Sequence, residues 1–146
     1  MKNTYISLLL LFAINLILVN AGRKVEYTTF HEDFQSEYNV KHITDGGNKF
    51  YPKMGDKVKI HFKAMSPHTF KLWYTSQNHA AMEITLGTGS STKCWDNVVI
   101  RMSKGEKIYV VCKAESVYDG KGTKFIPVDS DVGFELELIS ITRGEQ

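Results

Sequence analysis

The chain has little that would mark a nucleic-acid-binding protein or a cofactor-dependent enzyme. Its formal net charge is only +2, and its 18 basic residues are scattered instead of forming a stripe, so we expect no nucleic-acid partner. The five histidines show no metal-ligand spacing. The run GTGSST lacks the third glycine of a dinucleotide-binding turn and any Gly-Lys-Ser/Thr, and no Ser-His-Asp or Cys-His signature stands in a recognisable context. We therefore expect no metal and no other cofactor.

A hydrophobic run long enough to cross a membrane is also missing. The apolar stretch near the N-terminus contains Ser7 and Asn15, and it is shorter than the roughly 20 residues that a membrane-spanning helix needs. One lysine precedes it and the small-residue exit Val-Asn-Ala follows it, a pattern typical of a cleavable secretory signal. We interpret residues 1–21 as a signal peptide, and we expect no stable membrane insertion after its cleavage.

The rest of the chain has the length of one domain. Residues 22–38 combine acidic and aromatic side chains without a clean period, so this N-terminal extension is compatible with an extra strand, a docked arm or a mobile tail. Residues 39–146 carry regular hydrophobic patterns. We expect one folded domain over 39–146, and we expect it to be a monomer.

Cysteine is scarce, because the chain has only Cys94 and Cys112. In an exported chain the two could form one disulfide, since the secretory route is oxidising. They could equally remain two buried thiols, and the sequence leaves both readings open. No Asn-X-Ser/Thr glycosylation acceptor is present. We expect the protein in the lumen of the endoplasmic reticulum or outside the cell.

Several stretches alternate between apolar and polar residues, as strands with one buried face do. The clearest is KVKIHFK, where Val58, Ile60 and Phe62 share one face. The same period occurs in three further segments, which are MEITL at 82–86, KIYVVCK at 107–113 and GFELELISI at 133–141. This alternation indicates an antiparallel sheet with one solvated face.

One stretch has the period of a helix instead. Its apolar stripe, at positions i, i+3, i+4 and i+7, consists of Trp95, Val98, Val99 and Met102. We predict that Thr92 caps the start of this helix and that Gly105 ends it. The apolar faces of helix and sheet must cover each other. We therefore predict an α+β fold in which a curled antiparallel sheet of four to five strands wraps around one short helix.

The stretch from 114 to 131 shows no period and is longer than a loop in a compact domain usually is without a function. It carries Tyr118, Phe125 and Ile126 among polar residues. Apolar side chains in such a loop often rim a binding site.

Five fragments, in order and with near-regular spacing, resemble the FKBP-type peptidyl-prolyl isomerases, the macrolide-binding immunophilins. They are the YPKMGD turn, the segment LGTGSSTKCWDNVVIRMSKGEK, the tyrosine of VYDG, the Ile-Pro of FIPVD and the ending GFELELISI. The resemblance covers about residues 39–141. It implies a sheet curled around a helix, with a proline-binding pocket between them.

The resemblance also implies roles for individual residues. Trp95 matches the tryptophan that forms the floor of the pocket, and Phe134 matches a wall aromatic. Tyr118 matches the tyrosine whose hydroxyl meets the ligand, and the backbone N–H of Thr92 matches the donor to a substrate carbonyl. We predict that these four are the catalytic residues.

Substrate-binding positions follow in the same way. Aligning WYTS with the family's Phe-Asp-Ser-Ser puts Trp73 on a wall aromatic and Tyr74 where a carboxylate is expected. Phe62 replaces a tyrosine and Met82 replaces an aromatic residue. The predicted substrate-binding set is Phe62, Trp73, Tyr74, Met82, Ser91, Phe125 and Ile126.

Rotation about an X-Pro bond needs no nucleophile, base or metal, so a pocket alone can catalyse it. We predict a peptidyl-prolyl isomerase that assists the folding of proteins in the secretory pathway and acts on proline-containing polypeptides. The altered rim predicts weak activity and weak macrolide binding. Two alternatives stay open: a catalytically weak or inactive FKBP-like protein-binding module, and a β-barrel carrier of apolar ligands, which is disfavoured because a helix fills the interior.

Overall fold

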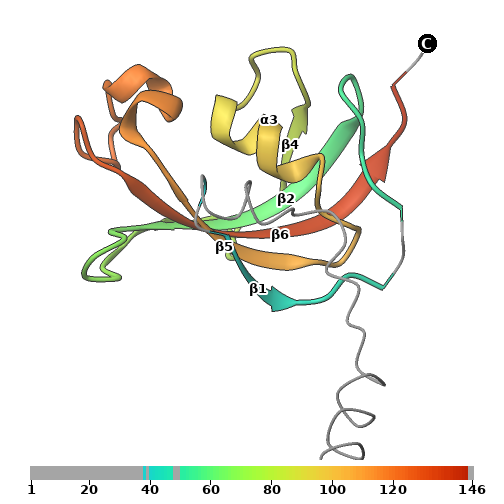
Figure 1. Ribbon diagram of the computed structural model, residues 1–146, viewed down its shortest axis with the longest axis horizontal. Helices are drawn as coiled ribbons and strands as arrows, with labels where there is room; N and C mark the ends of the chain where they lie inside the picture. The colour runs from blue at the N-terminus through green and yellow to red at the C-terminus, as the bar shows by residue number, and fades with distance from the viewer. Residues whose placement is uncertain (1–37, 39, 48–49, 145–146) are drawn as a thin grey trace, which may run out of the picture.

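The computed structural model describes residues 38, 40–47 and 50–144. The predicted signal peptide lies outside these residues, as does the predicted N-terminal extension apart from Tyr38. In the described residues an antiparallel sheet of six strands curls around helix α3 (Figure 1). The predicted α+β class is confirmed. In this part of the chain no helix is both long and apolar enough to span a bilayer.

The strands run in the order β1-β5-β6-β2-β3 across the sheet, and β4 also pairs with β2. All of these pairings are antiparallel. The elements are β1 (Lys41–Thr44), β2 (Lys57–Met65), β3 (Leu72–Thr75), β4 (Met82–Thr85), α3 (Lys93–Val99), β5 (Lys107–Cys112), the 3-10 turns η1 (Ala114–Ser116) and η2 (Tyr118–Gly120), and β6 (Val132–Thr142).

The sheet has more strands than the four to five that we predicted. The short strand β1 was not predicted, because its residues are mostly exposed and show no alternation. On the far side of β2, two separate strands share one edge: β4 pairs with Lys57–Ile60 and β3 with Lys63–Met65. A hydrophobic pattern does not reveal that two strands share an edge.

The predicted alternation is confirmed in four strands. The buried inner positions of β2, β4, β5 and β6 include Val58, Ile60, Ile84, Ile108, Val110, Cys112, Phe134, Leu136 and Leu138. The outer positions carry lysines and glutamates that pair across strands, as Lys63 does with Glu135 at 3.0 Å and Lys107 with Glu137 at 3.3 Å. The period of two therefore keeps charge on the outer face of the sheet.

Helix α3 covers the inner face of the sheet (Figure 1). Thr92 caps it as predicted, since its hydroxyl accepts the Trp95 N–H at 3.2 Å. The helix ends at Val99, earlier than predicted, because the Met102 N–H bonds to the Val99 carbonyl and so tightens the chain into a 3-10-type turn. Met102 is nevertheless fully buried, so the apolar stripe continues past the end of the helix.

A buried carboxylate joins the two ends of the domain. Asp56 precedes β2 and accepts the Lys53 N–H at 2.8 Å and the Gly144 N–H at 3.1 Å. It also pairs with the guanidinium of Arg143, which lies over the ring of Phe50 at 4.2 Å from the centroid. These contacts fix the end of β6 against the turn that leads into β2.

We predict that Asp56→Asn lowers the free energy of unfolding at pH 7 by about 1–3 kcal/mol. The substitution removes the negative charge and replaces one of the two oxygens that accept the backbone N–H groups of Lys53 and Gly144. Burial by itself raises the pKa of Asp56, but its backbone and Arg143 donors outweigh burial and hold the pKa below the ordinary value of 3.8. The carboxylate thus stabilises the fold above its unfolded-state pKa, and this contribution is lost as pH falls through the lower folded-state pKa.

Urea denaturation at several pH values measures this effect. The stability gap between Asp56→Asn and the unmodified protein should shrink below about pH 4. Glu83→Gln is the matched control, since Glu83 is in an exposed pair with Lys59 at 3.9 Å, and such pairs contribute about 0–1 kcal/mol. A gap that is the same at pH 7 and pH 3 would contradict the role given to Asp56.

Candidate active site

A cavity of about 440 Å³ opens between strand β2, the chain from β3 to β4 and the loop that follows β5. Its lining carries no charged side chain among the described residues. The lining residues are Phe62, Ala64, Tyr74, Ser76, Ala80, Met82, Tyr118, Thr123, Phe125 and Ile126. Six of these belong to the predicted site, and the fold brings them together from four separate stretches of the chain.

Three aromatic rings form one side of this cavity. The ring of Phe62, on β2, lies 5.3 Å from that of Tyr74, on β3. The Tyr74 ring lies 5.1 Å from that of Phe125, on the loop after β5. Because each ring comes from a different segment, the row exists only when the sheet and the loop are both in place.

Two predicted catalytic aromatics lie in a second layer. Trp95 is only 3% exposed and Phe134 1% exposed, and neither lines the cavity. Trp95 meets Phe62 edge to face, with centroids 4.9 Å apart, and Phe134 at 5.2 Å. Trp95 thus supports Phe62 from the core side. The role of Trp95 as the floor that touches substrate stays a prediction.

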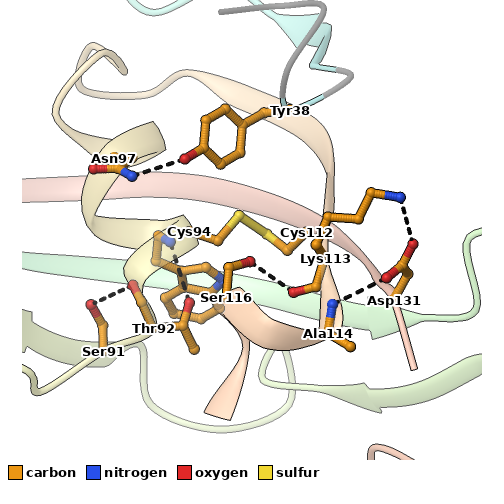
Figure 2. Close-up of a disulfide and its surroundings, with 11 residues drawn as sticks. Tyr38, Ser91, Thr92, Cys94, Asn97, Cys112, Lys113, Ala114, Ser116 and Asp131 are labelled. Carbon is orange, nitrogen blue, oxygen red and sulfur yellow. Dashed lines mark hydrogen bonds and ion pairs between the residues drawn. A yellow bond between two sulfur atoms is a disulfide. The ribbon is translucent and has the colours of Figure 1, made fainter. Parts of the chain in front are cut away.

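The side chains of Ser91 and Thr92, two further predicted site residues, bond to the first turn of helix α3. The Thr92 hydroxyl caps the helix (Figure 2). The Ser91 hydroxyl donates to the Asp96 carboxylate at 2.7 Å. Neither residue is in the lining of the cavity. Their side chains hold the first turn of the helix, and the backbone N–H of Thr92 stays a predicted donor.

The structure resolves the state of the cysteines. Cys94 and Cys112 form a disulfide, and both are fully buried (Figure 2). The bond joins the residue before Trp95 to the last residue of β5, where the loop begins. It therefore ties the helix that supports the site to the base of the loop that rims it.

The rim loop, residues 113–131, is closed at its base by a carboxylate. Asp131 accepts the Ala114 N–H at 3.1 Å and pairs with the ammonium of Lys113 at 2.9 Å (Figure 2). Further along, the Thr123 hydroxyl accepts the backbone N–H groups of Phe125 at 3.2 Å and Ile126 at 3.1 Å. These bonds shape the turn that presents the two apolar side chains to the cavity.

Tyr118 is the lining residue with a phenolic hydroxyl on the loop after β5. Its backbone has φ of 56°, in the left-handed region, and its side chain is 47% exposed. Partial burial raises the pKa of Tyr118 above its ordinary value of 10.0. The hydroxyl therefore stays protonated at neutral pH and is a hydrogen-bond donor, as its predicted role requires.

The structure differs from our alignment of the WYTS stretch. Tyr74, aligned with a carboxylate, lies in the aromatic row, whereas Trp73, aligned with a wall aromatic, does not line the cavity. Met82 lines it and is partly exposed, as a rim residue would be. Adjacent residues of a strand point to opposite faces, so a shift of one residue in the alignment would put Tyr74, and not Trp73, on the wall aromatic.

Sequence reasoning missed four lining residues: Ala64, Ser76, Ala80 and Thr123. Thr123 could have been found, because a threonine two or three residues before apolar residues in a polar loop is typical of a side-chain-capped turn. The alanines have no distinguishing chemistry. Ser76 follows β3 directly, and its importance depends on a strand pairing that no local pattern shows.

Comparisons with known proteins agree with this geometry. Residues 48–139 match the model of a family described as FKBP-type peptidyl-prolyl cis-trans isomerase. FK506-binding protein 1A of Emericella nidulans is 31% identical over 70% of this chain and 95% of its own length. The Drosophila melanogaster peptidyl-prolyl cis-trans isomerase Fkbp12 is 27% identical over 68% of this chain and 93% of its own.

A solved structure has the same fold. The crystal structure of a peptidyl-prolyl cis-trans isomerase from Pseudomonas syringae pv. tomato superposes with a TM-score of 0.60. The two share 20% sequence identity, over 71% of this chain and 74% of that one. At this identity the likeness concerns the fold.

We predict that replacing both cysteines by alanine lowers the free energy of unfolding by about 3 kcal/mol, because the bond closes a loop between residues 18 apart in sequence. Urea denaturation without reductant measures the loss. Added reductant should bring the unmodified protein close to the double variant and leave the variant unchanged. Equal stability of the two proteins, or two free thiols in the unfolded, unreduced protein, would contradict this.

Proposed function

The chain belongs to the FKBP-type peptidyl-prolyl cis-trans isomerase family, and from this we propose that its uncharged cavity binds the proline of an X-Pro bond and rotates that bond in proteins of the secretory pathway. The observation that carries the proposal is the row formed by Phe62, Tyr74 and Phe125. These rings, with Ile126, present flat apolar surface of the kind that a pyrrolidine ring fits. All three rings lie within residues 48–139, which match the family model.

The chemistry needs only such a surface and a few donors. Rotating the amide bond passes a barrier of about 18–20 kcal/mol, because resonance is lost in the twisted state. The planar amide is charge-separated, so an uncharged cavity disfavours it relative to the twisted state. The Tyr118 hydroxyl and the Thr92 N–H are the donors that we assign to the carbonyls on either side. Each tenfold gain in rate requires about 1.4 kcal/mol of preferential stabilisation.

One observation favours the second candidate function, a catalytically weak protein-binding module. Trp95 is covered by Phe62, so a proline ring entering the cavity first meets Phe62 and Tyr74. Both candidates bind proline-containing segments, and only catalysis separates them. A protease-free assay of X-Pro isomerisation decides between the two.

We expect the protein to accelerate isomerisation of an X-Pro peptide in that assay. Trp95→Leu should lower kcat/KM by about tenfold or more, or about 1.4 kcal/mol, because Phe62 loses its edge-to-face support. Val98→Ala, buried on the same helix, is the control for lost core volume and should have little effect per folded molecule. Unchanged kcat/KM and peptide affinity in a folded Trp95→Leu protein would overturn the role given to Trp95.

Adding a macrolide as a competitor to the same isomerisation assay tests how tightly the cavity binds such a drug. The lining carries no carboxylate, and Phe62 lacks a tyrosine hydroxyl. The cavity therefore lacks polar anchors that we expect a macrolide to use, whereas a proline ring depends mainly on the apolar surface. We propose weak macrolide binding, well above the nanomolar range. Inhibition at nanomolar concentration would show that the missing groups are not the ones that the drug uses.

The secretory assignment rests on two features. The first 21 residues have the pattern of a cleavable signal, and a buried disulfide suits an oxidising compartment. We expect the chain expressed in a eukaryotic cell to begin at Gly22 and to co-fractionate with secretory organelles or the medium. N-terminal sequencing tests this, and an intact Met1 on protein recovered from the cytosol would refute it.

A further inference from the structure

One short stretch of β2 faces no strand on the cavity side. β4 pairs with β2 as far as Ile60, and β3 begins to pair at Lys63. His61 and Phe62 lie between these two pairings. A backbone N–H or carbonyl left unpaired in a buried place destabilises the fold, so the open edge at Phe62 needs another partner.

Ser76 supplies that partner. Its backbone N–H donates to the Phe62 carbonyl at 2.9 Å, and its hydroxyl oxygen accepts the Phe62 N–H at 2.8 Å. A neighbouring strand would use its own N–H and carbonyl for the same two bonds. Ser76 follows β3 directly and is only 3% exposed, so the two bonds are shielded from water.

The Ser76 hydroxyl has two possible acceptors for its own hydrogen. Its hydrogen can go to the Phe62 carbonyl or to Nδ1 of His61, since both lie 3.3 Å from Oγ. In either case the oxygen keeps a lone pair for the Phe62 N–H. The serine side chain can therefore hold Phe62 whichever acceptor its own hydrogen uses.

Because a side chain replaces a strand carbonyl, the main chain can leave the sheet at this point. The Ser76 carbonyl accepts the His79 N–H at 2.9 Å and so begins a turn. The chain then passes Ala80 and Met82, and these two residues line the cavity together with Ser76. The cavity thus lies where the sheet edge is interrupted.

The Phe62 ring lies between the aromatic rings that line the cavity and the buried rings behind them. It contacts Trp95 at 4.9 Å on the core side and Tyr74 at 5.3 Å on the cavity side. A displacement of the Phe62 backbone would move its ring relative to both. Whatever fixes this backbone also fixes the surface offered to a substrate.

We propose that Ser76 is a positioning residue of the isomerase site, which holds the Phe62 ring in place by pairing both backbone groups of that residue. The proposal rests on the proposed function for its effect on catalysis. It assigns Ser76 no direct part in bond rotation. Its action passes through Phe62.

The test compares Ser76→Ala with Ser76→Thr, which keeps the hydroxyl, and with Ser90→Ala. Ser90 is the matched control, because its hydroxyl also bridges a strand residue: it accepts the Thr85 N–H at 3.0 Å and donates to the Thr85 carbonyl at 2.8 Å. Ser90 lies in the exposed turn after β4, outside the cavity. All three variants are assayed where circular dichroism shows them to be folded, and rates are expressed per folded molecule.

We expect Ser76→Ala to raise KM for an X-Pro peptide about fivefold, as the loss of one hydrogen bond would, with a smaller change in kcat. Ser76→Thr should recover most of this loss, and Ser90→Ala should leave KM unchanged. Normal kinetics per folded molecule in Ser76→Ala would overturn the proposal, because Ser76 would then be merely structural. An equal loss in Ser90→Ala would overturn it as well.

A second measurement needs neither catalysis nor a variant. In the unmodified protein, hydrogen exchange at the Phe62 amide should be as slow as at amides in the centre of the β2–β6 pairing. Fast exchange at Phe62 would overturn the positioning role even if Ser76→Ala failed to fold. If the unmodified protein neither bound nor isomerised X-Pro peptides, the proposed function would be wrong, and the Phe62 exchange rate would still decide whether Ser76 holds this residue.

Discussion

The site depends on the position of β2 between two different neighbours. On one side β2 pairs with β6 along its whole length, from Lys57 to Met65. On the other side it pairs with β4 and β3 in turn and leaves Phe62 to Ser76. The pairing with β6, which has one register shift between Lys59 and Ile60, holds the strand along its length, and the interrupted side makes room for a cavity. A sheet paired fully on both edges would leave no such space beside Phe62.

Much of this architecture could be predicted from the sequence, because burial imposes a period. The alternation of Val58 and Ile60 with lysines predicted the start and the buried face of β2, which runs two residues further than predicted, and Thr92 marked the start of the helix. The resemblance to the family, carried by five fragments and extended to the strands between them, located six of the ten residues that line the cavity. The hydrophobic period and the helix cap are local signals, and the order of the fragments is a matter of spacing along the chain. Both can be seen in a single sequence.

The rest depended on contacts between segments distant in sequence. Which of Trp73 and Tyr74 faces the cavity depends on strand register, and a shift of one residue exchanges them. Ser76 resembles any serine after a strand until its partner on β2 is known. The disulfide could not be decided either, because two cysteines 18 residues apart suit a bond only if the fold brings them together.

The disulfide also bears on the order in which the chain acquires its structure during synthesis. Both cysteines precede β6, which begins at Val132. In a chain that emerges from its N-terminus, the bond can therefore form before the strand that completes the sheet has docked. Helix α3 would then already be tethered to β5 when β6 arrives between β5 and β2. An oxidising compartment entered during translation would let covalent chemistry, and not only packing, set the order of assembly.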